Sequence, residues 1–377
     1  MDPNGSRESV KLLFYLESLC SGGAERVTAN LANHWVQKGL KVVVVTHAPV
    51  STDFYRLDPS IERVALDLRG EADHAVVVLW RNFRRIAALR RELSRVKPDV
   101  AVAMMSVANV LLAFASYGLP VRAIGAERVH PPLFGFEGVR RWVACRSYGR
   151  LCAVTVQTQK SADWVKAHTS ARRVSVIPNA ATWPLPKHEP VIDPASLIRP
   201  RRRMLLAVGR LEEQKGFDLL IPAFASLAQQ HPEWDLAILG EGSQRAALGA
   251  LVRFARMEDR VFLPGRVGNV ADWYGRAELY AMSSRFEGFP NTLAEALASG
   301  VPAVSFDCNT GPRDLIRPDV DGLLAPPGDT EALTAALACL MSDEAMRQRC
   351  AGRAIEARER YSMSGVAAMW ENLFAEL

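Results

Sequence analysis

The stretch Arg203–Phe217, RMLLAVGRLEEQKGF, sets the pattern by which the rest of the chain can be interpreted. It begins with a short apolar run typical of a buried strand, passes through a loop from Gly209 to Gly216, and continues into a helix. Arg210 and Lys215 place two cations at the start of that helix, where backbone N–H groups already favour anions. The stretch predicts a strand–loop–helix unit that holds a diphosphate, and a solvated loop with ordinary surface charges is the alternative.

The same alternation extends in both directions from this unit. We expect strands at 10–16, 42–46, 99–105, 121–126, 153–157, 174–177, 203–208, 236–239, 261–263, 279–283 and 303–306. Short apolar runs separated by helices predict parallel sheets with helices on both faces. Because the 377 residues exceed what one hydrophobic core usually holds, we expect an α/β fold of two doubly wound, Rossmann-like domains.

A proline-rich break divides the alternation into two parts. Residues 181–203 hold five prolines and show no clear period. We therefore expect a first domain over 1–180, a linker over 181–202 and a second domain that starts at 203. The two domains are expected to face each other across a cleft, with ligands bound outside the carboxyl ends of the strands.

A second motif follows the strand expected to end near Ser283. It is Glu287-Gly288-Phe289-Pro290-Asn291-Thr292-Leu293-Ala294-Glu295. Pro290 suits the first turn of a helix, and the backbone N–H groups around 288–292 would point at a ligand. The carboxylate of Glu295, about one turn into that helix, can accept bonds from two sugar hydroxyls. A capping loop with a glutamate on the helix surface is the alternative.

The two motifs together resemble retaining glycosyltransferases of family 4, which have the GT-B fold. The resemblance rests on Gly-Arg-Leu-x-x-x-Lys-Gly at 209–216 and on Phe-Glu-Gly-Phe-Pro-Asn-x-x-x-Glu-Ala at 286–296. Further matches to the family are the glycine loop at 21–25, the strand end at 178–179, the glycine turn at 240–242 and the loop at 321–324. The resemblance covers nearly the whole chain and is to the type that builds bacterial surface polysaccharides and lipid-linked glycans.

The resemblance implies roles for the residues of the two motifs. Arg210 and Lys215 would hold the donor diphosphate and neutralise the leaving group, and Glu295 would bind ribose. Glu287 would hold the donor sugar together with the backbone of Gly288, Phe289, Pro290, Asn291 and Thr292. By the same resemblance, 1–180 would bind the acceptor and 203–365 the nucleotide-sugar, and a helix at 366–377 would cross back to the first domain.

Other donor-binding residues implied by the resemblance lie in glycine turns and at a strand end. Gly240 and Glu241 belong to the turn of the second domain, and Arg266 and Val267 to the segment expected along the nucleotide base. Gly22 and Gly23 would let the first domain approach phosphate or acceptor closely, because they lack side chains.

One first-domain run departs from the family. Where members often carry a Ser-Glu-Arg-Asn-Asp-Pro-like run, this chain has Ala126-Glu127-Arg128-Val129-His130-Pro131. We expect His130 to be catalytic, either bonding the donor's sugar hydroxyls or steering the acceptor, and we consider Glu127 and Arg128 as further candidates in the same run. A loop histidine with a local hydrogen bond is the alternative.

The expected reaction is transfer of a hexose or N-acetylhexosamine with retention of configuration. Arg and Lys are expected to do the electrostatic work of a metal, with no cofactor beyond the nucleotide-sugar. We therefore interpret Asp319-Val320-Asp321, which spells a metal-binding Asp-x-Asp, as a solvated turn. The run 306–313 resembles a segment of enzymes that extend polyprenyl-diphosphate glycans and favours a UDP-sugar, with GDP-mannose as the alternative donor. Less favoured alternatives are a nucleotide-sugar epimerase, a glycogen-type phosphorylase and a non-catalytic nucleotide-sugar-binding module.

Charge is divided unequally along the chain. Residues 1–180 hold 25 Lys/Arg and 15 Asp/Glu, whereas residues 181–377 hold 21 and 26. In Trp80–Leu93 five arginines lie beside apolar residues, and Arg140-Arg141-Trp142 forms a second basic and aromatic cluster. This pattern predicts peripheral contact with an anionic membrane, whereas a packed helix with a solvated arginine face is the alternative. No nucleic-acid-binding motif is present, so nucleic acid is not an expected partner.

Localisation follows from what the sequence lacks. No apolar stretch is long enough to span a bilayer, and the first residues lack the apolar region of a signal peptide. The six cysteines have no metal-ligand spacing, which favours reduced thiols. We expect a cytoplasmic protein at the inner face of the membrane, acting on a polyprenyl-diphosphate-linked or glycan acceptor.

Overall fold

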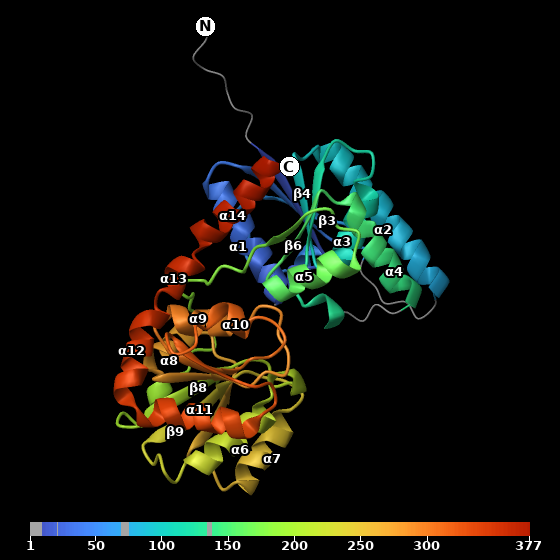
Figure 1. Cartoon of the computed structure of the whole chain (residues 1–377). Helices are drawn as coiled ribbons and strands as arrows, with labels where there is room; N and C mark the ends of the chain where they lie inside the picture. The colour runs from blue at the N-terminus through green and yellow to red at the C-terminus, as the bar shows by residue number, and fades with distance from the viewer. Residues whose placement is uncertain (1–9, 21, 69–74, 134–137) are drawn as a thin grey trace. The chain divides into compact units, whose positions relative to one another are not determined.

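The chain forms two compact parallel α/β units. The computed structural model describes residues 10–20, 22–68, 75–133 and 138–377. Unit 1 comprises Met1–Asn179 and Val366–Leu377, and unit 2 comprises Ala180–Gly365 (Figure 1). Each unit is built around one all-parallel sheet, so the expectation of two Rossmann-like domains is confirmed.

Unit 1 is built on a seven-stranded sheet in the order β3-β2-β1-β4-β5-β6-β7. The strands are β1 Lys11–Leu16, β2 Lys41–Thr46, β3 Glu62–Ala65, β4 Val100–Met104, β5 Arg122–Ala126, β6 Ala153–Val156 and β7 Val174–Val176. Residues 12–16, 42–46 and 100–104 are buried, because both faces of the central strands are covered. The order reverses between β1 and β4, and this is where such sheets bind ligands.

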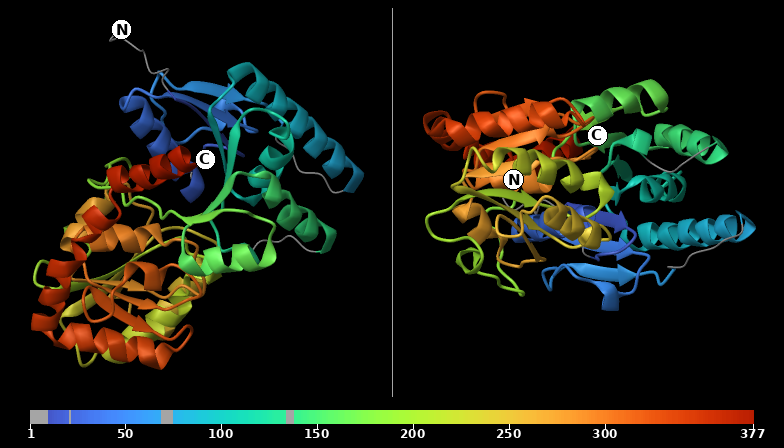
Figure 2. Two further views of the ribbon diagram at one scale, coloured as in Figure 1. Left: turned by 45° about the horizontal axis from the view of Figure 1, so that its top comes forward. Right: turned by 90° about the horizontal axis from the view of Figure 1, so that it is seen from below.

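Helices cover both faces of this sheet. They are α1 Gly23–Gln37, α2 Ala75–Val96, α3 Ser106–Ala115, α4 Gly138–Ser147, α5 Gln159–His168 and α14 Met363–Glu376. Leu89 and Leu93 of α2 share one core with Leu112 of α3. On the opposite face α14 lies beside α1, and the rings of Trp35 and Phe374 are 5.5 Å apart (Figure 2). The last helix therefore belongs to the core of unit 1.

Unit 2 is built on a six-stranded sheet in the order β10-β9-β8-β11-β12-β13. The strands are β8 Arg203–Val208, β9 Trp234–Leu239, β10 Val261–Gly265, β11 Leu279–Met282, β12 Ala303–Phe306 and β13 Gly322–Ala325. The helices are α6 Phe217–Leu227, α7 Arg245–Phe254, α8 Val270–Arg276, α9 Asn291–Ala298, α10 Pro312–Leu315, α11 Thr330–Ser342, α12 Glu344–Ala354 and α13 Ala357–Arg360. Two cores, one on each face of the sheet, hold the layers together.

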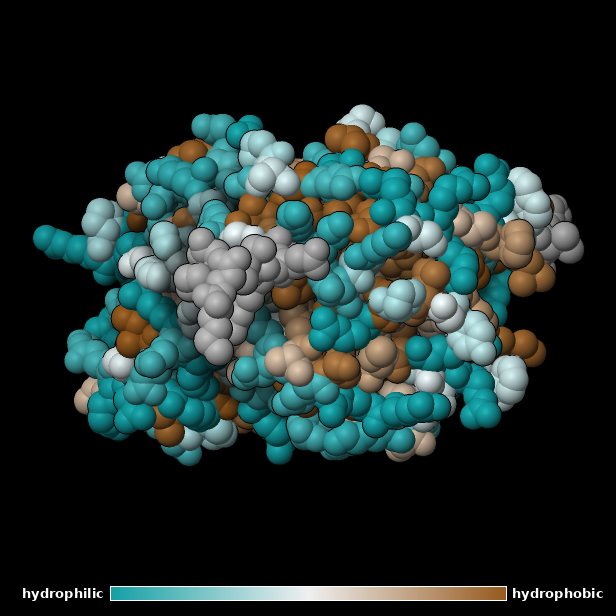
Figure 3. All heavy atoms as spheres, turned by 90° about the horizontal axis from the view of Figure 1, so that it is seen from above, coloured by the Kyte–Doolittle hydropathy of each residue, from teal (hydrophilic) through white to brown (hydrophobic). Residues whose placement is uncertain are grey.

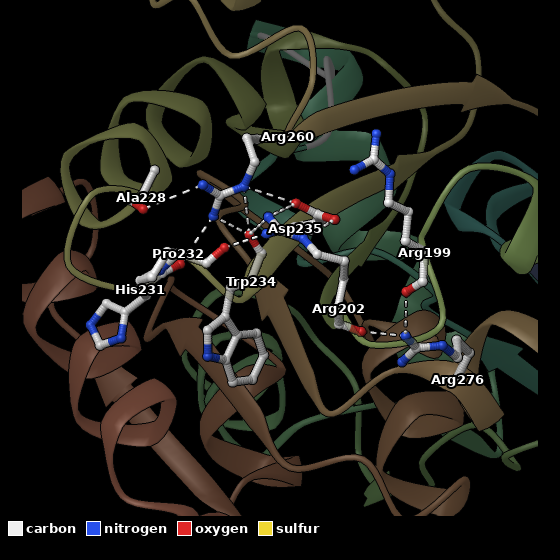
Figure 4. A network of polar contacts seen from close by, with 9 residues as sticks. All are labelled: Arg199, Arg202, Ala228, His231, Pro232, Trp234, Asp235, Arg260 and Arg276. Carbon is white, nitrogen blue, oxygen red and sulfur yellow. Dashed lines mark hydrogen bonds and ion pairs between the residues drawn. The ribbon is translucent and has the colours of Figure 1, made fainter.

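An ion-pair network fastens the amino-terminal ends of the unit 2 strands (Figure 4). Asp235, 3% exposed, accepts hydrogen bonds from Arg202 Nε at 2.9 Å and from Arg260 Nε at 2.9 Å. Arg260 also donates to the carbonyl of His231 at 3.0 Å. Two guanidinium groups on one carboxylate join β9 to the segments before β8 and β10, so these charges stabilise the fold at the edge opposite the carboxyl ends.

The proline-rich segment after residue 180 packs on unit 2. Leu185 and Ile198 are buried in its core, and His188 N donates to Gly268 O at 3.0 Å. Trp273 Nε1 donates to Ile192 O at 3.0 Å. Proline-rich composition here marks an irregular chain held on a surface.

Sequence reasoning missed two strands. β3 at the edge of unit 1 has the sequence Glu-Arg-Val-Ala, two charged residues followed by two apolar ones, and β13 covers the segment 322–324, which was expected to be a loop. Both are edge strands of four residues, too short for a clear period. No helix in the described ranges is both long and apolar enough to cross a bilayer.

Candidate active site

Two loops from neighbouring strands meet at the carboxyl edge of the unit 2 sheet. The strand order reverses between β8 and β11, so the loops that follow these strands leave from the switch point. Gln214 Nε2 donates to Phe286 O at 2.9 Å, and Arg285 N donates to Gln214 O at 2.8 Å. Ser283 Oγ donates to Lys215 O at 2.9 Å. The two sequence motifs thus form one structural unit.

The centre of this unit is an ion pair that sequence reasoning did not foresee. Lys215 Nζ lies 2.6 Å from Glu287 Oε1, and the side chains are 16% and 7% exposed. Ser284 Oγ donates to the same carboxylate oxygen at 2.7 Å. The structure therefore joins the residue expected on the diphosphate to the residue expected on the sugar. The Lys215 ammonium group can therefore contact the Glu287 carboxylate and an incoming anion at the same time.

Glycines let backbones approach closely around this pair. Gly216 has φ +63°, and a Cβ there would lie 2.1 Å from Ser283 O. Gly240 has φ +140°, and a Cβ there would lie 1.9 Å from Gly209 O. Both positions require glycine for conformation and for space. The glycine turn after β9 is thereby locked to the loop after β8.

Helix α9 presents its first turn to the same edge. It begins at Asn291, with Pro290 as the preceding cap residue. Tyr280 Oη donates to Thr292 Oγ1 at 2.9 Å. Glu295 is 3% exposed, and Tyr274 Oη lies 3.4 Å from its Oε2. Its carboxylate is more enclosed than a helix-surface glutamate would be.

The loop 287–290 is held in place by contacts with Tyr361 and with the segment 310–311. Phe289 is 7% exposed and packs edge-on against the ring of Tyr361 at 5.8 Å. Thr310 Oγ1 donates to the carbonyl of Glu287. A Cβ on Gly311 would lie 3.1 Å from Gly288 O. The loop that carries Glu287 is thus fixed by Phe289 within it and by the run 306–313, and the sequence did not indicate this supporting role.

Three charged residues that follow β8, β9 and β10, namely Arg210, Glu241 and Arg266, are exposed. Arg210 is exposed, and its Nη2 lies 3.5 Å from Gln214 Oε1. Glu241 forms an ion pair with Arg245 at 2.8 Å. Arg266 is exposed, and Val267 packs on the core of unit 2. These residues share the carboxyl edge with Lys215, so a ligand lying across this edge can reach them.

In unit 1 the glycine loop after β1 is occupied by its own chain. Gly22 is the N-cap residue of α1, and Gly23 is exposed at the first position of that helix. A Cβ on Gly22 would lie 2.0 Å from Glu25 Oε2. Burial raises the pKa of Glu25, and hydrogen bonds to its own backbone and to Ser18 oppose that rise. Gly22 therefore makes room for a carboxylate, a reason that the sequence did not suggest.

Glu127, at the end of β5, is enclosed by hydrogen-bond donors. Ser106 Oγ donates to it at 2.5 Å and Asn109 Nδ2 at 3.0 Å, and Tyr148 Oη also donates. It is 2% exposed, and burial raises its pKa. The side chain fastens α3 and the turn after α4 to the end of β5, so this residue positions its neighbours.

Arg128 is buried as well, on the other side of the same loop. It is 7% exposed, donates to Asn179 Oδ1 at 3.0 Å, and has its guanidinium 5.5 Å from the ring centre of Trp370. Burial lowers the pKa of this guanidinium to about 10, partly offset by Glu127. Arg128 thus links the end of β5 to Asn179, the last residue of the first segment of unit 1, and to Trp370 of helix α14.

His130 is held by α5. Its Nδ1 lies 3.0 Å from Ser161 Oγ, and the side chain is 6% exposed. Burial lowers its pKa below 6.5, and the nearby Lys160 lowers it further. Both effects favour the neutral form of the ring. The local hydrogen bond that served as the alternative is present, and the catalytic role stays a prediction.

The expected solvated turn at 319–321 is wrong for one of its two acids. Asp319 is exposed with φ +63°, but Asp321 is fully buried. Arg317 Nε donates to Asp321 at 2.7 Å and Arg360 Nη2 at 3.1 Å. Asp321 is a structural anchor because two guanidinium groups neutralise it. Among the described residues no group of three His, Cys, Asp or Glu side chains is placed to hold a metal ion.

Two families of known proteins match the two halves of the chain. The family described as "Glycosyltransferase Family 4" matches residues 21–181, and "Glycosyl transferases group 1" matches residues 189–357. An exopolysaccharide phosphotransferase of Streptomyces coelicolor is 32% identical over 296 residues, 77% of this chain. The chain spans only 30% of that relative's length.

Other similar proteins match from end to end. The GalNAc-alpha-(1->4)-GalNAc-alpha-(1->3)-diNAcBac-PP-undecaprenol alpha-1,4-N-acetyl-D-galactosaminyltransferase of Campylobacter jejuni is 27% identical over 98% of this chain and 99% of its own. The solved structure of HepE from Anabaena, in complex with UDP, superposes with a TM-score of 0.79 at 20% identity, covering 98% of this chain and all of the other. The likeness in structure shows the fold.

Proposed function

This chain belongs to the glycosyltransferases of family 4 and group 1 with the GT-B fold, and from that premise we propose its substrates and mechanism. It transfers a hexose or N-acetylhexosamine from a UDP-sugar to a lipid-linked or polysaccharide acceptor, with retention of configuration and without a metal. The observation that carries the proposal is the Lys215–Glu287 pair at the switch point of unit 2, beside exposed Arg210.

The two cations suit a departing diphosphate. Lys215 is fixed by its pair with Glu287, whereas Arg210 is exposed and can fold onto a ligand. Negative charge grows on the diphosphate as the glycosidic bond breaks, and preplaced cations stabilise that charge without reorganisation. Arg210 offers a planar fork that matches phosphate oxygens, and Lys215 offers a point charge. Together they supply what a metal ion supplies in other transferases.

The remaining donor contacts follow from the edge of the sheet. The first turn of α9 directs backbone N–H groups outward, and Glu287 reaches the sugar from the loop before it. Glu295 would accept the ribose hydroxyls, with Tyr274 beside its carboxylate. Gly240, Glu241, Arg266 and Val267 follow β9 and β10, and they would line the nucleotide on the far side of Arg210.

The donor nucleotide is proposed to be UDP. In the run 306–313, Thr310 donates to the carbonyl of Glu287. Burial raises the pKa of the nearby Cys308 thiol to about 12, so this thiol stays protonated. The structural neighbour HepE was solved with UDP. GDP-mannose is the competing donor, which a donor panel separates from UDP-sugars.

The acceptor is proposed to be a polyprenyl-diphosphate-linked or related glycan. The name of the Campylobacter relative specifies a glycan on PP-undecaprenol. In the reaction we propose, the leaving diphosphate helps to deprotonate the acceptor hydroxyl on the same face of the sugar. Neutral His130 would orient a hydroxyl through Nε2, because Nδ1 is engaged by Ser161.

A lipid-linked acceptor places the enzyme at a membrane, and we propose that unit 1 makes the contact. Leu79 and Phe83 of α2 are each 70% exposed, and Trp80 is 58% exposed. In α4, Val139 is 77% and Trp142 67% exposed. Hydrophobic atoms appear at the right-hand edge of the view in Figure 3, toward the start of α2. Exposed aromatic side chains beside arginines are typical of interfacial helices.

The arginines of α2 do not contribute equally to this surface. Arg85 donates to Leu68 O at 3.0 Å, and Arg90 donates to Ala115 O at 2.9 Å, so both serve the fold. Arg84 lies 4.7 Å above the ring of Trp80, and Arg91 is exposed. Of these four arginines, Arg84 and Arg91 are therefore the ones that can meet anionic lipid.

The test of the proposed function is a donor panel with and without a polyprenyl-diphosphate-linked acceptor. Release of UDP, dependent on acceptor and unaffected by EDTA, is the expected result. Activity that is lost in EDTA and restored by Mg²⁺ would overturn metal independence. Tight binding of UDP-sugar without transfer to any acceptor would favour a non-catalytic binding module.

A further inference from the structure

A basic cavity lies in unit 1 at the amino-terminal edge of its sheet. Its volume is about 600 Å³, and it is formed between the ends of α3 and α4, the turn before β6 and the turn before β7. Its walls include Phe114, Trp142, Arg146, Arg150, Ser170 and Arg172. The candidate active site, by contrast, lies on unit 2 at a carboxyl edge. Nothing in the proposed reaction uses this cavity.

Three guanidinium groups line the cavity without an acid among the lining residues. Arg146, Arg150 and Arg172 are all exposed, and within the described part of the chain none of them forms an ion pair. Arg173, the next residue along, differs because it pairs with Glu376 at 3.1 Å. Three like charges around one hollow repel each other, and an anion between them would relieve that repulsion.

The cavity is built, not merely a gap between mobile side chains. The Arg150 guanidinium lies 4.5 Å from the ring centre of Phe114 and 5.2 Å from that of Tyr117. Stacking uses the face of the group and leaves its N–H edge for an anion. Gly149 N donates to Ser170 Oγ at 2.8 Å, and a Cβ on Gly149 would lie 2.8 Å from that oxygen. This bond fixes the wall between Arg150 and Arg172.

We propose that this cavity binds the phosphodiester headgroup of an anionic phospholipid, an inference that rests on the proposed membrane contact of unit 1. The arginines would receive the phosphodiester. Trp142 lines the cavity yet is 67% exposed, so its ring can enter the acyl boundary beside the bound headgroup. A soluble phosphate would use the three cations alone, whereas a phospholipid also uses the tryptophan. The cavity would then set the orientation of unit 1 on the bilayer.

The test uses the full chain and two variants of equal charge. One carries Arg146→Gln, Arg150→Gln and Arg172→Gln, and the matched control carries Arg201→Gln, Arg253→Gln and Arg349→Gln, three exposed arginines of unit 2. Cosedimentation is measured with phosphatidylcholine vesicles that contain or lack phosphatidylglycerol. We expect the dissociation constant for phosphatidylglycerol vesicles to rise about 10- to 100-fold in the cavity variant and far less in the control.

A second arm separates the source of the anion. Calorimetry compares inorganic phosphate with dihexanoyl phosphatidylglycerol, using wild type, the cavity variant and Trp142→Ser. The lipid should bind more tightly than phosphate, and Trp142→Ser should weaken only the lipid. Equal loss of vesicle binding in both triple variants, or equal affinity for phosphate and lipid, would overturn the inference. If the wild-type protein did not bind vesicles, the proposed membrane contact would be wrong. The calorimetry would still show whether the cavity binds the phospholipid headgroup.

Discussion

The carboxyl edges of the two sheets carry comparable polar residues, but their side chains stay accessible in unit 2 and are enclosed in unit 1. In unit 2, Lys215 and Glu287 pair with each other, and exposed Arg210 stays available beside them. In unit 1, Glu127 is surrounded by Ser106, Asn109 and Tyr148. The first arrangement is open to a ligand, whereas the second is complete by itself. A charged residue after a strand is therefore a candidate for chemistry only where its partners leave it accessible.

The largest expected effect sharpens this contrast on the unit 2 side. Lys215→Ala should lower the catalytic constant about 10²- to 10³-fold, because it removes a positive charge of the protein that stabilises the leaving diphosphate. The affinity for the donor should change less, since the cation matters most in the transition state. Initial rates of UDP release give both quantities.

The control is Lys187→Ala, which breaks an exposed ion pair with Asp272 in the same unit. Its activity should stay close to that of wild type. If Lys215→Ala altered affinity alone and left turnover intact, the catalytic interpretation of the pair would fail.

On the unit 1 side the expected effect is on stability. Glu127→Ala leaves three buried donors without their acceptor and should cost about 1–3 kcal/mol of the free energy of unfolding. Chemical denaturation measures it, with exposed Glu17→Ala as the control. If Glu127→Ala were as stable as the control but had lost activity, Glu127 would be a substrate contact and not a positioning residue.

The same residue predicts a pH dependence. Burial raises the pKa of Glu127 above 4.5, so the folded state holds this proton more tightly than the unfolded chain does. The resulting stability is present below the unfolded value and is lost as pH rises through the folded pKa. Glu127→Gln cannot titrate, so its unfolding free energy relative to wild type should improve from acid to neutral pH. A difference that does not change with pH would contradict this.

Glycines offer a smaller test of the same comparison. Gly216→Ala meets the carbonyl of Ser283 at positive φ and should cost about 1–3 kcal/mol. Gly22→Ala meets only the flexible Glu25 carboxylate, which can rotate away, and should cost about 1 kcal/mol or less. Thermal unfolding of both variants is the measurement. Equal losses would show that the glycine loop of unit 1 is as constrained as the one in unit 2.

The smallest effect concerns His130. His130→Ala removes one hydrogen bond to a substrate hydroxyl, worth about 1 kcal/mol, and should lower turnover about fivefold. Because burial keeps its pKa below 6.5, wild-type activity that depends on the neutral ring should decline only at acidic pH, and the variant should lack that decline. Identical pH–rate profiles would assign His130 to local structure.

The sequence was informative where glycines and charges recur at fixed spacing. The strand of β8, the Gly209–Gly216 loop and the motif around Pro290 were placed correctly because apolar runs and glycines fix them locally. The pairing of Lys215 with Glu287 was not foreseeable, since 72 residues separate them and only the sheet topology brings them together. Ser284, which donates to Glu287, has no signature in the sequence, and Thr310 was noticed only as part of the run 306–313, without its contact to the Glu287 carbonyl. Edge strands and the burial of Asp321 were missed because they depend on distant partners.

The central claim is that the carboxyl edge of unit 2 holds the nucleotide-sugar. Calorimetric titration with UDP-sugars, paired with transfer rates, tests it directly on wild type, Glu295→Ala and Glu287→Ala. The account predicts that Glu295→Ala weakens donor binding through the lost ribose contact, and that Glu287→Ala mainly lowers turnover. Unchanged affinity and unchanged rate in both variants would contradict it.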